Sequence, residues 1–497
     1  MNSRLPWSLL CVTLAAALLL ASPSQEGAPA AKSDEWHKLY VEGKPAGFLR
    51  ITTQPLEGGG LATSLQQKIV LKRGPVAVEM EISSTQEEDA RGKLLSFSTE
   101  QKLSKNSMKT SGVVRGDSLV ITEMTGTSQK RESRIPVPPD AVGYRKSEEM
   151  TRSALKKPGD SVEIVVFVPE VLRFGKQKAV LGNEEAVDCL GVRKTLLHTT
   201  VTQDIMPGVK IDQWVDKDFN LQKSSTVALG LEIVTHRSTA KEVLSMDLSS
   251  PPEVFLSTSI RSNKKIPRGA REVTYRVKSK QDGFPTTESD QLFKATGQEL
   301  VREEGPRARI LRVRREAPKA SRERPIPPTA ELEECLKPNP YIQSDDKKIV
   351  ETARKELSGI KDAWESACHL ERWVHDNIRT KGLETAFATA SEVMETREGD
   401  CTEHGVLLAA LLRAAGLPSK VAAGLIYHDG AFVGHMWTEV YIGEWVPLDA
   451  TLGECVVGAE HIALTTTSLE TSSILDFFCG MVSFFGNVEI EVLDIRE

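Results

Sequence analysis

The chain of 497 residues is poor in the features that define several protein classes. Aromatic residues make up 5% of it, and its seven cysteines lack the dense, regular spacing of a disulfide scaffold. Its 63 basic and 69 acidic residues leave a formal net charge of −6. The near balance excludes a wholly disordered polyion, and the slight acidity argues against nucleic acid as the main partner.

Long apolar runs and metal-binding loops are also scarce. Beyond the N-terminal segment, no run is long and apolar enough to span a bilayer. No segment has the spaced carboxylates of a calcium loop. We therefore expect no metal and no organic cofactor, and the length predicts about two to four domains.

Residues 1–31 have the layout of a secretory signal. Arg4 supplies a positive charge, Trp7 to Ala21 is almost wholly apolar, and small residues and prolines follow. We predict a signal peptide over 1–31 and an exported protein, periplasmic or extracellular, which touches a membrane only if this segment stays uncleaved. Cleavage would remove Cys11 and leave six cysteines in a compartment that permits disulfides.

The stretch 32–249 alternates apolar and polar residues with period two, as in Val209 to Val215. Turn signals such as Gly58-Gly59-Gly60 separate the runs, and Arg145 to Lys157 is the best helix candidate. We predict a β-rich N-terminal domain built on a large, mostly antiparallel sheet. Residues 250–329 follow as a connecting region with a few strands.

From Asp345 the apolar period becomes helical and then returns to that of strands. Helices followed by antiparallel strands predict an α+β module within a C-terminal domain over 330–497. The expected elements are helices over 345–357 and 362–379, helices opening at Thr389 and at Asp400, and strands over 420–427, 432–442 and 445–449.

Cys401, His435 and Asp449 form the pattern that carries chemistry. Cys401 would be the first residue of its helix, where roughly half a positive charge favours the thiolate and backbone N–H groups can hold an oxyanion. His435 could act as the base, and Asp449 on the neighbouring strand could orient its ring. Asp400, His404 and Trp437 are candidates for supporting roles around them, as helix cap, packing residue and wall of the site.

Strand register offers a check on this triad. A two-residue turn, Gly443-Glu444, would put His435 and Asp449 on opposite faces of the hairpin. A three-residue turn pairs Tyr441 with Trp445. It puts the side chains of His435 and Asp449 on one face, as diagonal neighbours. We therefore predict the three-residue turn or a bulge.

Three segments then give a resemblance to a family. Gly399-Asp400-Cys401-Thr402-Glu403-His404, Gly434 to Val440 and Trp445 to Thr451 are similar to the three motif blocks of the transglutaminase-like superfamily. The similarity covers roughly residues 340–460, with the motif core at 345–455. It implies a papain-like fold, a Cys-His-Asp triad and acyl transfer through a thioester. The family includes transglutaminases, proteases and peptide-glycan amidases.

Hydrolysis of a peptide or isopeptide-type amide is the activity that we expect, with a protein or peptide as substrate. A protein-crosslinking transglutaminase is one alternative, and a non-catalytic exported binding or assembly module that retains the fold is another. A metal site formed by Cys401 and His404 with His428 or His435 is a less favoured interpretation. Cys368, Cys455 and Cys479 are expected to be buried core thiols. The sequence makes no prediction of the oligomeric state.

Overall fold

The structure is a computed structural model of the chain, and it describes residues 32–73, 76–125, 131–253, 259–280, 283–284, 293, 295–379, 386–469, 477 and 484–497. These residues form two compact units. Of the described residues, those within 32–253 and Phe477 belong to the N-terminal unit, and those within 259–469 and 484–497 belong to the C-terminal unit. No helix in the described ranges is long and apolar enough to cross a membrane.

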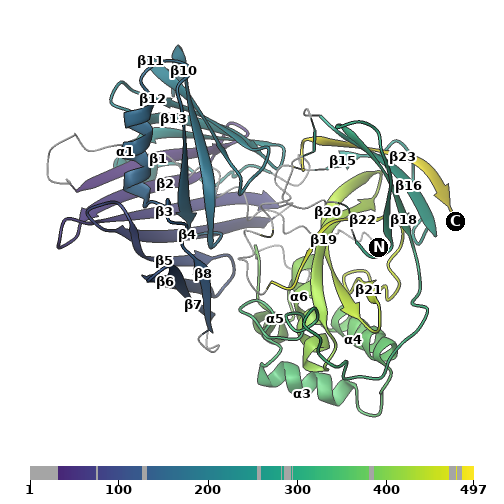
Figure 1. Cartoon of the computed structure of the whole chain (residues 1–497). Coiled ribbons are helices and arrows are strands. Elements are labelled where there is room, and N and C mark those ends of the chain that lie inside the picture. The colour runs from purple at the N-terminus through teal and green to yellow at the C-terminus, as the bar shows by residue number, and fades with distance from the viewer. Residues whose placement is uncertain are drawn as a thin grey trace. The chain divides into compact units, whose positions relative to one another are not determined.

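The described residues of the N-terminal unit form a fourteen-stranded antiparallel sheet (Figure 1). Two meanders, β1 to β8 and β9 to β14, join through the β1–β14 pair. The large antiparallel sheet expected from the sequence is thus confirmed. Its strands are β1 Ser33–Val41, β2 Lys44–Pro55, β3 Leu61–Arg73, β4 Val76–Glu88, β5 Leu94–Lys102, β6 Ser107–Arg115, β7 Ser118–Thr125, β8 Arg131–Pro136, β9 Ser161–Val168, β10 Arg173–Cys189, β11 Val192–Gln203, β12 Lys210–Val215, β13 Leu221–Ala228 and β14 Leu231–Ser238.

The sheet curves so that strands far apart in its order meet across one face. The rings of Phe97 on β5 and Phe167 on β9 lie 4.7 Å apart in a shared apolar cluster. Helix α1 (Tyr144–Ala154) connects the two meanders, and Tyr144 packs against Leu49 and Leu65. The expected helix is confirmed, although it ends before Lys156, whose backbone N–H instead donates to Asp160. A short helix, α2 (Ala240–Leu244), follows β14.

The described part of the C-terminal unit combines helices with two antiparallel sheets. One sheet has the order β15-β20-β19-β22 with β21 on β20, and the other has the order β17-β18-β16-β23. The helices gather at one end of the unit, away from β16, β18 and β23 (Figure 1). The elements are β15 Ile260–Arg261, β16 Glu272–Ser279, β17 Gln298–Glu303, β18 Ala308–Arg314, α3 Lys347–Glu356, α4 Ala363–Asn377, α5 Ala390–Thr396, α6 Cys401–Ala414, β19 Ser419–His428, β20 Ala431–Tyr441, β21 Trp445–Leu448, β22 His461–Thr467 and β23 Val488–Arg496.

Helix α6 is the centre of this unit. Its residues from Cys401 to Arg413 are all buried, because α3, α4 and α5 pack around it and β19 and β20 lie against it. The helix ends at Ala414. Gly416 follows with a φ of 76°, in the left-handed region that glycine tolerates, and Pro418 comes two residues later. A helix enclosed in this way holds its first residue in a fixed position.

The described residues between 259 and 329 belong to the same compact unit as the helices. Strand β15 pairs with β20 through Ile260 and Phe432, and β16 pairs with the C-terminal strand β23. The sequence predicts a connecting region here, because the basic and proline-rich composition obscures the strand pattern. In the structure its strands extend both sheets of the unit.

Candidate active site

Cys401 begins helix α6, and its side chain is 1% exposed. Asp400 caps the helix: one carboxylate oxygen accepts from the Thr402 backbone N–H and from the Thr402 hydroxyl, both at 3.0 Å. Glu403 completes a capping box by accepting from the Asp400 N–H at 2.8 Å. Cys401 is not part of the disulfide that joins Cys368 and Cys455, and it is therefore a thiol at the positive end of a helix.

The approach to this helix requires glycine. Gly399 has a φ of 151°, and a Cβ at this position would lie 2.1 Å from the Glu403 Cβ. Glu403 also accepts from the Ala388 backbone N–H at 2.8 Å, so it joins the cap to the segment before α5. Burial, together with the neighbouring Asp400 carboxylate, holds the pKa of Glu403 well above its usual value.

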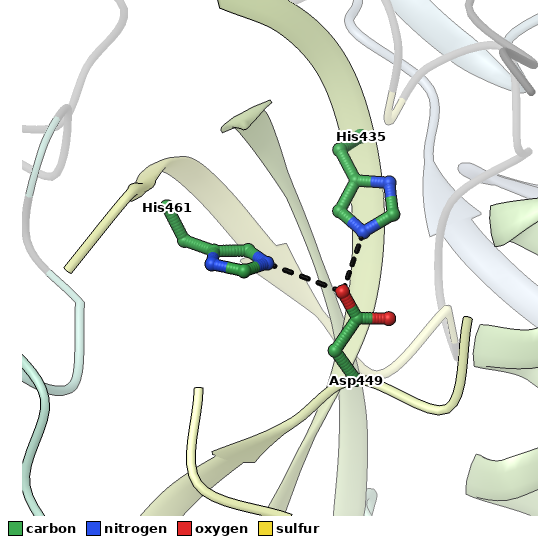
Figure 2. Close-up of side chains that lie close together, drawn as sticks. All are labelled: His435, Asp449 and His461. Carbon is green, nitrogen blue, oxygen red and sulfur yellow. Dashed lines mark hydrogen bonds and ion pairs between the residues drawn. The ribbon is translucent and has the colours of Figure 1, made fainter. Parts of the chain in front are cut away.

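His435 on β20 and Asp449 just after β21 meet in the interior. The His435 Nε2 atom lies 2.8 Å from an Asp449 Oδ atom, and the two side chains are 1% and 0% exposed (Figure 2). The other Asp449 oxygen accepts from the Thr451 backbone N–H at 2.9 Å. Tyr441 pairs with Trp445, so the predicted three-residue turn is confirmed.

The strand that carries His435 packs against the first turns of α6. The Thr438 hydroxyl donates to the Gly405 carbonyl at 2.9 Å, and a Cβ on Gly405 would lie 3.0 Å from the Met436 side chain. Cys401 and Gly405 are four residues apart and share one face of the helix. The face of α6 that carries Cys401 and Gly405 is therefore the face that packs against β20.

A second histidine, His461 at the start of β22, shares the same carboxylate. Its Nε2 lies 3.1 Å from the Asp449 oxygen that binds His435, and its side chain is 3% exposed (Figure 2). Sequence reasoning missed His461 because it lies in none of the three motif blocks. Only the pairing of β22 with β19, which places His461 opposite Ile426, brings it to the site.

Asp449 stays ionised in this interior. Burial alone would raise the pKa of its carboxyl group, but the charges and hydrogen bonds of His435 and His461 outweigh burial and hold the pKa well below its usual value. The cluster thus contains a fixed negative charge between two imidazole rings. Such a charge can both orient an imidazole and stabilise its protonated form.

Trp437 closes the cluster on one side. Its ring stacks on His435 with centroids 6.1 Å apart and meets His461 edge-on at 5.3 Å. The indole is buried and packs against Ala422 and Ala463. It therefore shields the imidazoles from water and belongs to the core at the same time.

The other histidines named from the sequence have different surroundings. The His404 ring lies 2.6 Å from the Asp400 carbonyl through Nδ1, so it packs back onto the cap of its own helix. His428 ends β19 at the Asp429-Gly430 turn. Within the described ranges, one group of side chains could supply three metal-ligand atoms within 4.8 Å of one another. Its members are His435, Asp449 and His461, and it includes neither Cys401 nor His404. Both Nε2 atoms of that group already bond to Asp449.

A disulfide joins Cys368 on α4 to Cys455 in the loop after Asp449, with Cα atoms 5.3 Å apart. The expectation of separate buried thiols at these positions is wrong. The two residues are 87 positions apart, and only the packing of α4 against that loop brings them together. Cys479 lies outside the described residues.

Glu371 on α4 is a buried acid near the site. Its side chain is 0% exposed, and neither carboxyl oxygen has a hydrogen-bond partner among the described residues. Burial, reinforced by the charges of Asp449 and Glu454, raises its pKa to about 8. Glu371 is therefore a protonated acid at neutral pH, one that sequence patterns do not reveal.

Replacing Glu371 by glutamine is expected to stabilise the protein at alkaline pH. Because the folded-state pKa is raised, the wild-type carboxyl costs no stability below its unfolded pKa of about 4.5, and it costs progressively more up to about pH 8. We expect a gain of about 1–3 kcal/mol in the free energy of unfolding near pH 8. Urea unfolding between about pH 5 and 9 measures it. The exposed Glu351→Gln is the control, and equal curves for both variants would contradict the burial of an acid.

Comparisons with known proteins identify the region around this cluster. Residues 350–450 match the family model of the Transglutaminase-like superfamily. No curated protein matches the chain in sequence.

Several solved structures are similar to parts of the chain, at low sequence identity. A protein from Cytophaga hutchinsonii, provisionally called a cysteine protease, is 19% identical over 45% of this chain and 89% of its own, with a TM-score of 0.28. A beta-barrel-like protein of a domain of unknown function from Brucella abortus is 13% identical over 42% and 96%, with a TM-score of 0.33. A provisionally named protease from Parabacteroides distasonis is 13% identical over 74% and 69%, with a TM-score of 0.21. The comparisons thus show that residues 350–450 are similar to the transglutaminase-like superfamily.

Proposed function

We propose that the protein is an exported thiol enzyme that transfers acyl groups through a thioester on Cys401. The observation that carries this proposal is the buried bond of 2.8 Å between His435 and Asp449, on the strand that packs against the helix beginning at Cys401. A nucleophile, a base and a residue that orients the base are the three parts that such chemistry needs. The similarity of residues 350–450 to the superfamily supports the same assignment.

In this proposal each group has its own step. Asp449 holds the Nε2 side of His435, which leaves Nδ1 as the atom that takes the proton from the Cys401 thiol. The thiolate attacks the substrate carbonyl, and the backbone N–H of Cys401 at the helix start holds the oxyanion. His435 then gives its proton to the departing amine, and a thioester to Cys401 remains. Water, activated by His435, attacks the thioester and releases the acid.

We favour a protease or amidase that hydrolyses a peptide or isopeptide-type amide. Water is the acceptor that needs no further site, whereas amine transfer needs a site that excludes water. A transglutaminase that passes the acyl group to a lysine amine uses the same first half-reaction, and the test below separates the two. The papain-like description of the region belongs to this proposal as well.

Export is part of the proposal. The signal-like segment over residues 1–31 lies outside the described residues, so its support is the sequence pattern. The disulfide between Cys368 and Cys455 adds an independent observation. Such bonds persist in oxidising compartments and are rare in a reducing cytosol.

Turnover of a panel of peptide amides, with and without a labelled primary amine, tests the proposal. We expect release of ammonia or amine with the free acid as the product, and we expect one equivalent of iodoacetamide on Cys401 to stop it. Incorporation of the labelled amine in place of hydrolysis would select the transglutaminase. Turnover that survives full alkylation of Cys401 would contradict the thiol mechanism.

A further inference from the structure

One carboxylate in this site holds two imidazoles. Asp449 accepts from His435 at 2.8 Å and from His461 at 3.1 Å through the same oxygen, and all three side chains are buried (Figure 2). The triad proposed above requires one of these bonds. The second bond, to His461, has no role in that scheme and needs its own explanation.

The hydrogen-bond partners of His461 determine which of its ring nitrogens carry a proton. Its Nε2 faces the Asp449 carboxylate, and its Nδ1 lies 3.3 Å from the Gly458 carbonyl oxygen. Carboxylate and carbonyl oxygens only accept hydrogen bonds, so both ring nitrogens must donate. A histidine with two N–H groups is an imidazolium cation. In agreement, burial lowers the pKa of His461, but the hydrogen bond and charge of Asp449 outweigh burial and raise it.

Asp449 is the acid that pairs with His461, because the other nearby acids have partners of their own. Asp449 is its bonded partner, while Glu460 accepts from the Gly269 backbone N–H and Glu454 pairs with Arg268 at 2.6 Å. Across Asp449 lies His435, with its ring centroid 5.7 Å from that of His461. A positive charge at this distance opposes a second positive charge on His435.

We propose that His461 is a positioning residue that fixes the Asp449 carboxylate and, as a buried cation, opposes protonation of His435. This inference rests on the proposed function, because it assigns His435 the role of base. In a simple Cys-His-Asp triad, the uncompensated carboxylate favours an ion pair of thiolate and imidazolium. Here His461 balances part of that charge, so His435 takes the proton of Cys401 less readily than it would in a simple triad.

Two substitutions separate charge from position. His461→Gln keeps an N–H that can reach Asp449 but removes the positive charge, whereas His461→Ala removes both. The measured quantity is the pH midpoint of Cys401 alkylation by iodoacetamide, resolved by mass spectrometry of the Cys401 peptide. We expect the midpoint to fall by about one pH unit in His461→Gln, because the His435 imidazolium is no longer opposed. His461→Ala should lower turnover at least tenfold, because Asp449 loses one of its anchors.

The matched control is His428→Gln, since His428 lies at the end of β19 and bonds to neither His435 nor Asp449 in the structure. If the wild-type midpoint lies below about 7.5, an unchanged or raised midpoint in His461→Gln would overturn the inference and leave the triad intact. A wild-type midpoint near that of an ordinary thiol, about 8.5, would instead contradict the proposed function.

A measurement on the unaltered protein keeps the inference testable if these variants fail to fold. Nitrogen-15 chemical shifts of the His461 ring distinguish one protonated nitrogen from two. We expect two at about pH 7, and a neutral ring at that pH would overturn the inference.

Discussion

Replacing Cys401 by alanine is expected to lower turnover by about four orders of magnitude or more, while the fold is retained. The proposed acyl intermediate forms on the sulfur of this thiol, and the neighbouring Thr402 hydroxyl is bound to the Asp400 carboxylate. Alanine fills most of the same buried space, so the helix and its Asp400 cap should persist. Initial rates with the substrate found by the panel above, together with the thermal midpoint of unfolding, measure both effects.

Cys189→Ala is the matched control for that experiment. Cys189 is also a thiol outside the disulfide, but it ends β10 in the N-terminal unit. Its removal should leave turnover unchanged. Turnover by Cys401→Ala within tenfold of wild type would show that the chemistry runs elsewhere.

Asp449→Asn is expected to damage both activity and stability. The carboxylate orients His435 and holds His461, and asparagine can neither accept both N–H groups with a full charge nor balance the His461 cation. A buried charge left without its partner costs about 3 kcal/mol or more. Loss of the correct imidazole orientation lowers turnover by about 10²–10⁴-fold. Urea unfolding and steady-state kinetics measure the two losses.

The pH dependence gives this prediction a signature. The folded-state pKa of Asp449 is depressed, so its stabilisation is present above the unfolded value near 4 and is lost as pH falls through the folded value. The free energy of unfolding of Asp449→Asn should therefore lack this fall in stability at acidic pH. Asp429→Asn is the control, because Asp429 is 93% exposed in the β19–β20 turn. A variant at position 449 as stable as this control at about pH 7 would contradict the buried charge cluster.

The parts of the site that the sequence predicted are those with a local pattern. Helix α6 was recognisable because Asp400 and Glu403 have the spacing of a capping box, which places Cys401 at its start. The pairing of Tyr441 with Trp445 followed from the requirement that His435 and Asp449 share a face. Period-two alternation likewise revealed the large sheet, because half-buried strands expose every second residue.

The parts that escaped prediction depend on contacts between distant segments. His461 reaches Asp449 through the pairing of β22 with β19, and Cys368 reaches Cys455 through the packing of α4 on a loop. Neither contact leaves a spacing in the sequence. Glu371 sits on the buried side of α4, where an acid contradicts the usual rule that charged residues face water. These three features surround the predicted triad, so chain topology supplied what the motifs lacked.

The pH dependence of Cys401 alkylation, in wild type and in His435→Ala, tests the central claim most directly. The account predicts a wild-type midpoint below about 7.5 and an upward shift of at least one pH unit in the variant, because the thiolate forms by passing its proton to His435. A midpoint near the ordinary thiol value of about 8.5 in both proteins would contradict the account. The buried cluster around Asp449 would then be structural, and Cys401 would be no activated nucleophile.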